Sequence, residues 1–155
     1  EVERLSLRTY LNRAGRPNTE GTGVALIYGV GAVTRGKNQY DPTMDDVAMG
    51  SDSVTRAFRD AVEDEDIEAI LFRVDSPGGS YVASGAIWRE TVKAREAGKP
   101  VIVSMSNVAG SGGYFVAMNA DKIVAQPGTI TGSIGVLGGK MVTTEFWKKL
   151  KMFIP

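Results

Sequence analysis

The chain has 155 residues, of which 43% are hydrophobic and 23% charged, and its 18 basic residues balance its 18 acidic ones. That length suffices for one domain with a sizeable core, and the absence of any long block of one charge argues against charge-driven nucleic-acid binding. The chain contains no cysteine and no histidine, which excludes disulfides, thiolate catalysis and the commonest metal ligands. We therefore expect no metal, no cofactor and no nucleic-acid partner.

The first part of the chain is predicted to consist of an arm followed by the start of a domain. Residues 1–23 carry charges and glycines and predict a lead-in arm or linker, with one short helix near Leu5 to Leu11. The domain is predicted over residues 24–155, truncated at its C-terminal end, and opens with a buried strand at Val24 to Tyr28. Residues 34–50 are polar and contain glycine, which predicts a loop.

After this loop, strands and helices are predicted to alternate. Apolar residues at i, i+3 and i+4 spacing predict a helix capped by Ser51 or Ser53 that ends in the acidic stretch 63–66. The later elements are a strand at 67–74, a helix at 81–97, a strand at 101–104, a short helix at 110–119, a strand at 122–125 and a helix at 145–151. Such repeated strand-helix units predict an α/β domain with a largely parallel sheet.

Two glycine-rich turns stand between a predicted strand and a predicted helix, Ser76-Pro-Gly-Gly-Ser80 and Ala109-Gly-Ser-Gly-Gly-Tyr114. Backbone N–H groups are free at such junctions, and glycines let other groups approach them. Either cluster alone is usually just a tight turn. Together they favour an acyl-transfer site, with Ser111 as nucleophile and the N–H groups of Gly78 or Gly79 and of Gly112 as oxyanion donors.

A serine nucleophile needs a base, and this chain offers no imidazole. A lysine, a carboxylate or a group from another chain remains. Lysine is the best candidate, because burial can lower its pKa from roughly 10.4 toward neutrality. We assign this role to none of the four lysines after residue 138, since lysine is rarely fully buried and these are expected on the surface: Lys140, Lys148, Lys149 and Lys151.

Five ordered motifs together resemble the signal peptide peptidase A (protease IV) family, over about residues 24 to 138. They are Val74-Asp-Ser-Pro-Gly-Gly-Ser80, Gly98-Lys-Pro-Val101, Ala109-Gly-Ser-Gly-Gly-Tyr114, Ala120-Asp-Lys-Ile-Val-Ala125 and Gly128-Thr-Ile-Thr-Gly-Ser-Ile-Gly135. The resemblance implies a ClpP/crotonase-like fold and a serine endopeptidase with a Ser/Lys dyad, which degrades cleaved signal peptides and other short apolar peptides.

The resemblance also implies a role for individual residues. It assigns the nucleophile to Ser111, the oxyanion-forming turn to Gly78 and Gly79, and a lysine-orienting serine to Ser133. It places the base lysine outside this chain, either beyond its C-terminal end or in a preceding first half of a longer protein. Members of the family form ring or dome homo-oligomers at the cell membrane, with the catalytic domain on the extracytoplasmic side.

Membrane association would then depend on segments absent from these residues, because no apolar run approaches the roughly 18 residues of a membrane helix. As given, the chain is expected to be soluble, and both of its ends look cut. Two other functions stay open. Crotonase-type proteins use similar paired N–H donors to stabilise enolates of acyl-CoA thioesters, although that chemistry needs no serine. A non-catalytic assembly scaffold is the other alternative.

Overall fold

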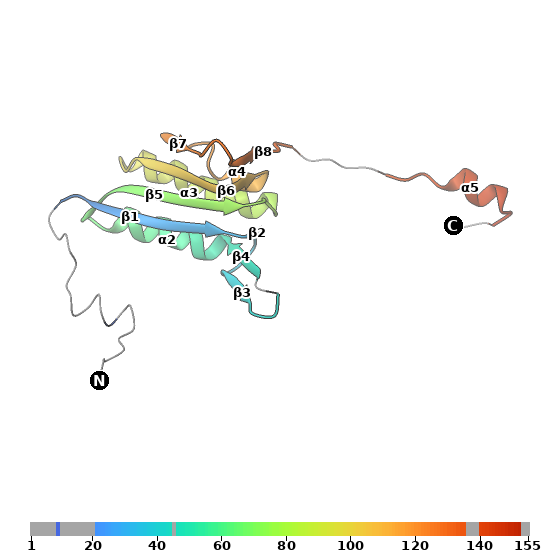
Figure 1. The fold of residues 1–155 in the computed structure, drawn as a ribbon, viewed down its shortest axis with the longest axis horizontal. Coiled ribbons are helices and arrows are strands. Elements are labelled where there is room, and N and C mark those ends of the chain that lie inside the picture. Colours follow the sequence, from blue (N-terminus) through green and yellow to red (C-terminus); the bar gives the residue numbers. More distant parts are fainter. Residues whose placement is uncertain (1–8, 10–20, 45, 136–139, 153–155) are drawn as a thin grey trace.

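The structure is a computed structural model that describes residues 9, 21–44, 46–135 and 140–152. Its centre is a five-stranded sheet in the order β1-β5-β6-β7, with β8 also paired to β6, and every pairing is parallel (Figure 1). The strands are β1 (Gly23–Val30), β5 (Ile67–Ser76), β6 (Val101–Gly110), β7 (Lys122–Val124) and β8 (Ile130–Gly132). The predicted parallel α/β architecture is confirmed.

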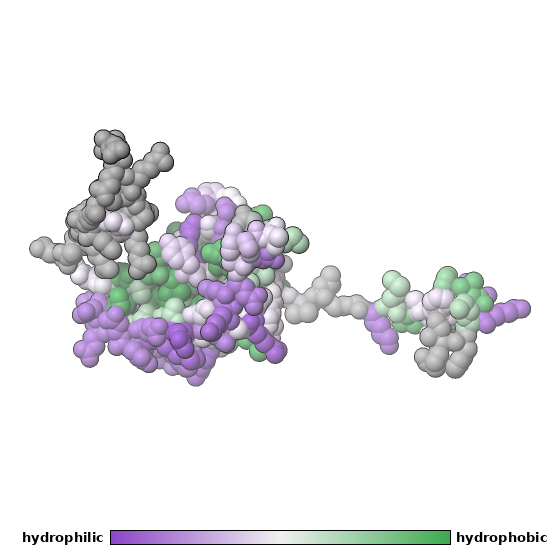
Figure 2. Space-filling view, turned by 90° about the horizontal axis from the view of Figure 1, so that it is seen from below, coloured by the Kyte–Doolittle hydropathy of each residue, from purple (hydrophilic) through white to green (hydrophobic). Residues whose placement is uncertain are grey.

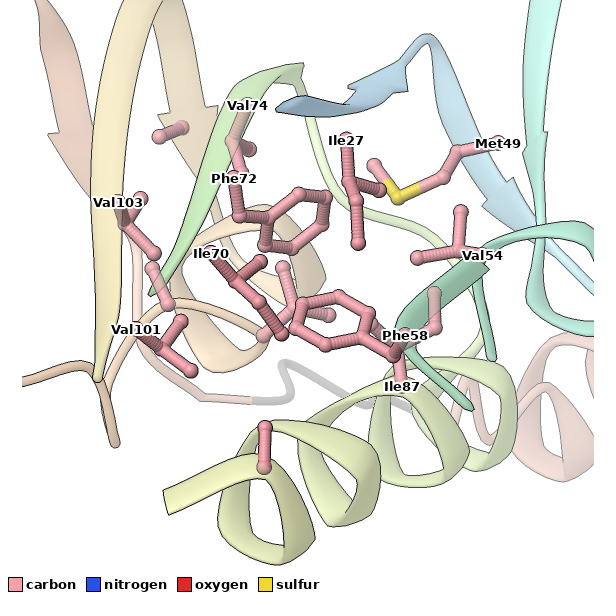
Figure 3. Packing of buried hydrophobic residues seen from close by; sticks show 14 of the residues in the cluster. Ile27, Met49, Val54, Phe58, Ile70, Phe72, Val74, Ile87, Val101 and Val103 are labelled. Atoms are coloured by element: carbon pink, nitrogen blue, oxygen red, sulfur yellow. The ribbon is translucent and has the colours of Figure 1, made fainter. Parts of the chain in front are cut away.

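One face of this sheet is covered by two helices, α2 (Ser51–Glu63) and α3 (Tyr81–Glu96). Strand residues alternate between the two faces, so every second residue of β5 from Ile70 to Ser76 is buried. In the core, Phe58 of α2 meets Phe72 of β5 edge to face, with ring centroids 5.2 Å apart (Figure 3). Ile87 of α3 and Val103 of β6 pack in the same cluster, which joins both helices to the sheet.

The other face of β1 is exposed and apolar. Its alternate residues are 39–59% exposed, namely Val24, Leu26, Tyr28 and Val30. Figure 2 shows hydrophobic surface on the body of the molecule, bordered by hydrophilic residues. Among the described residues, the helices therefore bury only one side of the sheet. No helix in the described part of the chain is long and apolar enough to span a membrane.

Residues 34–50 are not the predicted loop. They contribute to a second, three-stranded sheet in the order β2-β4-β3, made of β2 (Ala32–Thr34), β3 (Gln39–Asp41) and β4 (Asp46–Gly50). The prediction was wrong because these strands are three to five residues long, too short to show the alternation that identifies a strand. Only Val33 and the end of β4 are deeply buried.

Several boundaries also differ from the predicted ones. The cap residue of α2 is Gly50, which has no side chain to cap with, instead of Ser51 or Ser53. Ser53 Oγ accepts the N–H of Asn38 at 2.8 Å and so anchors the preceding segment.

Farther along the chain, α3 is capped by Ser80, and Gly98 follows it with a φ of +79°, as the predicted end of this helix requires. α4 (Gly112–Phe115) is a single turn, shorter than predicted. α5 (Thr144–Lys149) matches the last predicted helix. The helix predicted near residues 5–11 lies outside the described residues except for Thr9.

The buried carboxylate of Glu90 joins the two helices. Glu90 Oε1 accepts hydrogen bonds from Arg59 of α2 at 2.7 Å and from Lys93 of α3 at 3.0 Å, while its side chain is only 5% exposed. Burial raises the pKa of this carboxyl, but the bonds from Arg59 and Lys93 outweigh burial and hold the pKa below its usual value. The charged form of Glu90 therefore stabilises the fold.

We expect Glu90→Gln to lower the free energy of unfolding at pH 7 by about 1–2 kcal/mol, because Arg59 and Lys93 lose their anionic partner. The stabilisation is complete above the ordinary glutamate pKa of about 4.3 and is lost as the pH falls below it. Denaturant titrations from pH 7 to pH 3 measure this. The gap between wild type and variant should close at acidic pH, and a constant gap would contradict the assigned role.

Candidate active site

The Ser-Pro-Gly-Gly turn begins at the end of β5 and is held from two sides. Ser76 is fully buried, and its Oγ accepts the N–H of Gly78 at 3.1 Å. On the other side, Val33 of β2 donates to the carbonyl of Gly78 and accepts from Ser80, both at 2.8 Å. The N–H of Gly79, which lies between these bonds, donates to no other group among the described residues.

An irregularity in β6 brings the second glycine turn to the same edge of the sheet. β6 has extra residues opposite Asp75, since Val74 pairs with Met105 but Ser76 pairs with Ala109. The Asp75 carboxylate accepts hydrogen bonds from the backbone N–H of Val108 and from the side-chain amide of Asn107, both at 3.1 Å. These bonds supply acceptors for donor groups of the irregular segment. As a result β6 runs on to Gly110, beyond its predicted end near 104–106.

Ser111 follows directly and has a strained backbone. Its φ is +49° and its ψ is −117°, a region that non-glycine residues rarely adopt and that costs about 1–3 kcal/mol. Two hydrogen bonds hold it there, from its N–H to the carbonyl of Gly132 at 2.8 Å and from the N–H of Phe115 to its carbonyl at 2.9 Å. The half-buried Ser111 side chain has no hydrogen-bond partner among the described residues.

The backbones of the two turns are in close contact because glycine has no side chain at the contact positions. A Cβ atom on Gly78 would lie 2.7 Å from both the N of Gly112 and the Cβ of Ser111, and Gly78 has a φ of +104°. A Cβ atom on Gly112 would lie 3.2 Å from the N of Gly79. The structure thus brings together Ser111, Gly78, Gly79 and Gly112, with the N–H groups of Gly79 and Gly112 close to each other and to the serine. The N–H of Gly78 is not free, because it donates to Ser76 Oγ, and Gly78 contributes only its Cα to this contact.

Ser133 directly follows β8 and does not line the cavity beside Ser111. It follows Gly132, whose carbonyl accepts the Ser111 N–H, and it also has a positive φ, of +51°. Its side chain is exposed and has no hydrogen-bond partner among the described residues. The backbone of β8 therefore ties the position of Ser133 to that of Ser111.

No lysine reaches the serine within the described residues, which include all eight lysines of the chain. Three of them are engaged elsewhere: Lys93 pairs with Glu90, Lys148 pairs with Glu145, and Lys99 donates to the carbonyls of Ala61 and Asp64 at the end of α2. None lines the cavity next to Ser111. Nor do the described residues contain a group of three or more carboxylates that could hold a metal ion.

A cavity of about 310 Å³ opens beside Ser111. Its lining is almost wholly apolar and includes no charged side chain; it consists of Gly79, Tyr81, Ser84, Ser111, Gly112, Tyr114, Phe115, Met118, Ile134 and Gly135. The walls come from α3, from the α4 turn and its continuation, and from the segment after β8. Such a cavity beside a serine and two free N–H donors can hold an uncharged side chain while its neighbouring carbonyl lies at the donors.

Sequence analysis did not identify several residues that build this site. Ser76 and Val33, which hold the glycine turn, and Tyr81 and Phe115, which line the cavity, were not singled out. Ser76 directly precedes the Pro-Gly-Gly segment, so its position could have indicated a side-chain hydrogen bond to the turn. The other three carry no local pattern that predicts a role, because their position depends on the tertiary arrangement.

Comparisons with known proteins point to one peptidase family. The sequence model of peptidase family S49 matches residues 93–154. Protease 4 of Salmonella typhi is 45% identical over 122 residues, which cover 79% of this chain and 19% of that protein. The chloroplastic serine protease SPPA of Arabidopsis thaliana is 38% identical over 127 residues, which cover 82% of this chain and 18% of that protein. The chain thus spans less than a fifth of the length of these relatives.

Solved structures show the same fold. A membrane-bound stomatin-specific protease aligns with a TM-score of 0.54 and 18% identity, over 84% of this chain and 60% of that one. A chain of a Pseudomonas malonate decarboxylase aligns with a TM-score of 0.57 and 18% identity, over 88% of this chain and 55% of that one. The domain has the ClpP/crotonase-like α/β fold. Within that fold class, the chain belongs to peptidase family S49.

Because the two turns are in close contact, we expect a methyl group added at Gly78 to destabilise the fold strongly. Gly78→Ala should lower the free energy of unfolding by about 2–4 kcal/mol, because the new Cβ meets the Ser111 and Gly112 backbone at a positive φ. Gly128→Ala is the matched control, since its Cβ has no neighbour within 4 Å, and should change stability by at most about 0.5 kcal/mol. Thermal or denaturant unfolding compares the two, and equal stabilities would contradict the close approach.

Proposed function

We propose that this chain carries the nucleophile-bearing part of a serine endopeptidase of the signal peptide peptidase type. Ser111 is the nucleophile of a Ser/Lys dyad, and the base lysine comes from outside these residues. One observation carries the proposal: Ser111 lies in a strained conformation between two free N–H groups and beside an apolar cavity. Family membership and the strain typical of functional sites support it.

The chemistry follows from the positions of these groups. Ser111 Oγ attacks the carbonyl carbon of a peptide bond while the lysine takes its proton, and the carbonyl oxygen gains negative charge. The N–H groups of Gly79 and Gly112 stabilise this oxyanion, and each such donor typically contributes a factor of about 100–1,000 in rate. Gly78 lets the two turns come close enough for both donors to reach one oxygen.

The proposed base must approach from the side of Ser133. The Ser133 hydroxyl has no partner among the described residues and lies next to the residue that fixes Ser111. It is therefore available to bind and orient the lysine amine. A lysine that becomes buried between this hydroxyl, Ser111 and the apolar cavity would have its pKa lowered by burial, as a base near neutral pH requires.

The proposed substrates are cleaved signal peptides and other short apolar peptides in an extended conformation. The uncharged lining of the cavity supports this choice, because a charged side chain would be buried there without a partner. We further propose that the whole protein is a homo-oligomer associated with the cell membrane through other segments, with this domain on the extracytoplasmic side.

We expect Ser111→Ala in the complete protein to lower peptide hydrolysis at least about 1,000-fold and to abolish labelling by a fluorophosphonate probe. Ser104→Ala is the control, because this serine lies on the sheet and binds Arg73, and it should retain both activities. Hydrolysis that survives Ser111→Ala would refute the nucleophile. Wild-type protein that is neither labelled nor hydrolytic would favour the enolate-stabilising or scaffold alternatives.

We expect Ser133→Ala to lower kcat about 10- to 100-fold with little change in KM, because a lysine that loses its orienting hydroxyl transfers the proton less efficiently. The pH at half-maximal rate should also move, since the surroundings of the amine change. Thermal stability serves as the control and should not change, because the Ser133 side chain is exposed. An unaltered kcat and pH profile would remove Ser133 from the mechanism.

A further inference from the structure

Tyr81 has an unusual position at the cavity beside Ser111. It is the first residue of α3, directly after the Ser80 cap, and it lines the cavity although it is 71% exposed. The Tyr81 side chain thus lies at the surface, where it both packs against another aromatic ring and lines the cavity.

An aromatic stack holds the ring in place. The Tyr81 ring lies 5.4 Å from that of Phe115, tilted by 32°, and Trp88 stacks on the same Phe115 ring at 6.0 Å and 28°. Tyr81 and Trp88 are seven residues apart, which is about two helical turns, so both lie on one side of α3. Phe115 is thus fixed by Trp88 and Tyr81, whereas Tyr81 is supported by Phe115 alone among the described aromatic rings.

The remaining lining offers little polar recognition. Ser84 is fully buried, and its hydroxyl donates to the carbonyl of Ser80 at 3.0 Å, so that proton is already used. No charged residue lines the cavity. Selectivity must therefore come from size and apolar contact, and the residues that set the depth and the outer limit of the cavity decide which side chain it accepts.

We infer that Tyr81 is the residue that selects the substrate side chain entering this cavity, and that it favours a large aliphatic over a small one. The inference rests on the proposed peptidase function. A leucine side chain that precedes the cleaved bond would reach past Ser84 and Phe115 and bury against the Tyr81 ring. An alanine side chain at the same place is too short to touch Tyr81.

The test uses the complete protein and two peptides that differ only at the residue before the cleaved bond, leucine or alanine. Tyr81→Ala should lower kcat/KM about 10- to 100-fold for the leucine peptide, the range for lost apolar contacts in a pocket, and less than about 3-fold for the alanine peptide. Tyr81→Phe should restore the wild-type ratio between the peptides, because the phenol oxygen has no hydrogen-bond partner among the described residues.

Tyr28→Ala is the matched control, since this tyrosine is similarly exposed at 59% but lies on β1 and does not line the cavity; both kcat/KM values should stay unchanged. An equal fall for both peptides in Tyr81→Ala, or an unchanged ratio, would overturn the inference. If hydrolysis remains dependent on Ser111 in that case, the proposed function stands. If wild-type protein cleaves neither peptide and Ser111 is not labelled, both fail.

Discussion

Two backbone turns meet so closely that the first has no room for a side chain at Gly78, and the candidate site depends on this approach. Gly78 occupies one side, and the backbone of Ser111 and Gly112 the other. Three supports keep the turns in place: the Ser76 hydroxyl below the first turn, Val33 beside it, and Asp75 at the irregular segment of β6. Strain at Ser111 persists because its neighbours are fixed by these hydrogen bonds.

The sequence predicted the parts that local chemistry determines. Apolar runs between turns identified the main strands, and the helix predicted at 81–97 matches α3, which Ser80 caps and Gly98 follows. The three short strands within 32–50 were missed, because they are formed by pairing with one another and not by a pattern of their own. β6 was predicted too short, since only its pairing with β5 shows that the chain continues as a strand past the extra residues.

The candidate site likewise has features that the sequence predicted and features that it did not. Glycines that flank a serine after a strand identified Ser111 and the turn at 78–79, but the sequence left open whether Gly78 or Gly79 presents a free N–H. The answer depends on the Ser76 hydroxyl, which binds the N–H of Gly78. The cavity could not be predicted, because its walls join α3, the α4 turn and the segment after β8. Tyr81 and Phe115 are 34 positions apart and meet only in the folded chain.

In the proposed function, recognition and chemistry use separate parts of this site. The N–H groups of Gly79 and Gly112 would bind the oxygen of any carbonyl and so give no selectivity among peptides, whereas the apolar cavity would hold a substrate side chain. This separation explains why fold similarity alone does not determine function. The malonate decarboxylase chain shares the architecture at a TM-score of 0.57, and paired N–H donors serve an enolate as well as a tetrahedral oxyanion. In the proposed function, the Ser111 hydroxyl forms a covalent bond to the carbonyl carbon, which enolate stabilisation does not require. On this proposal, Ser111 is the residue that would distinguish peptide hydrolysis from the other chemistry this fold can support.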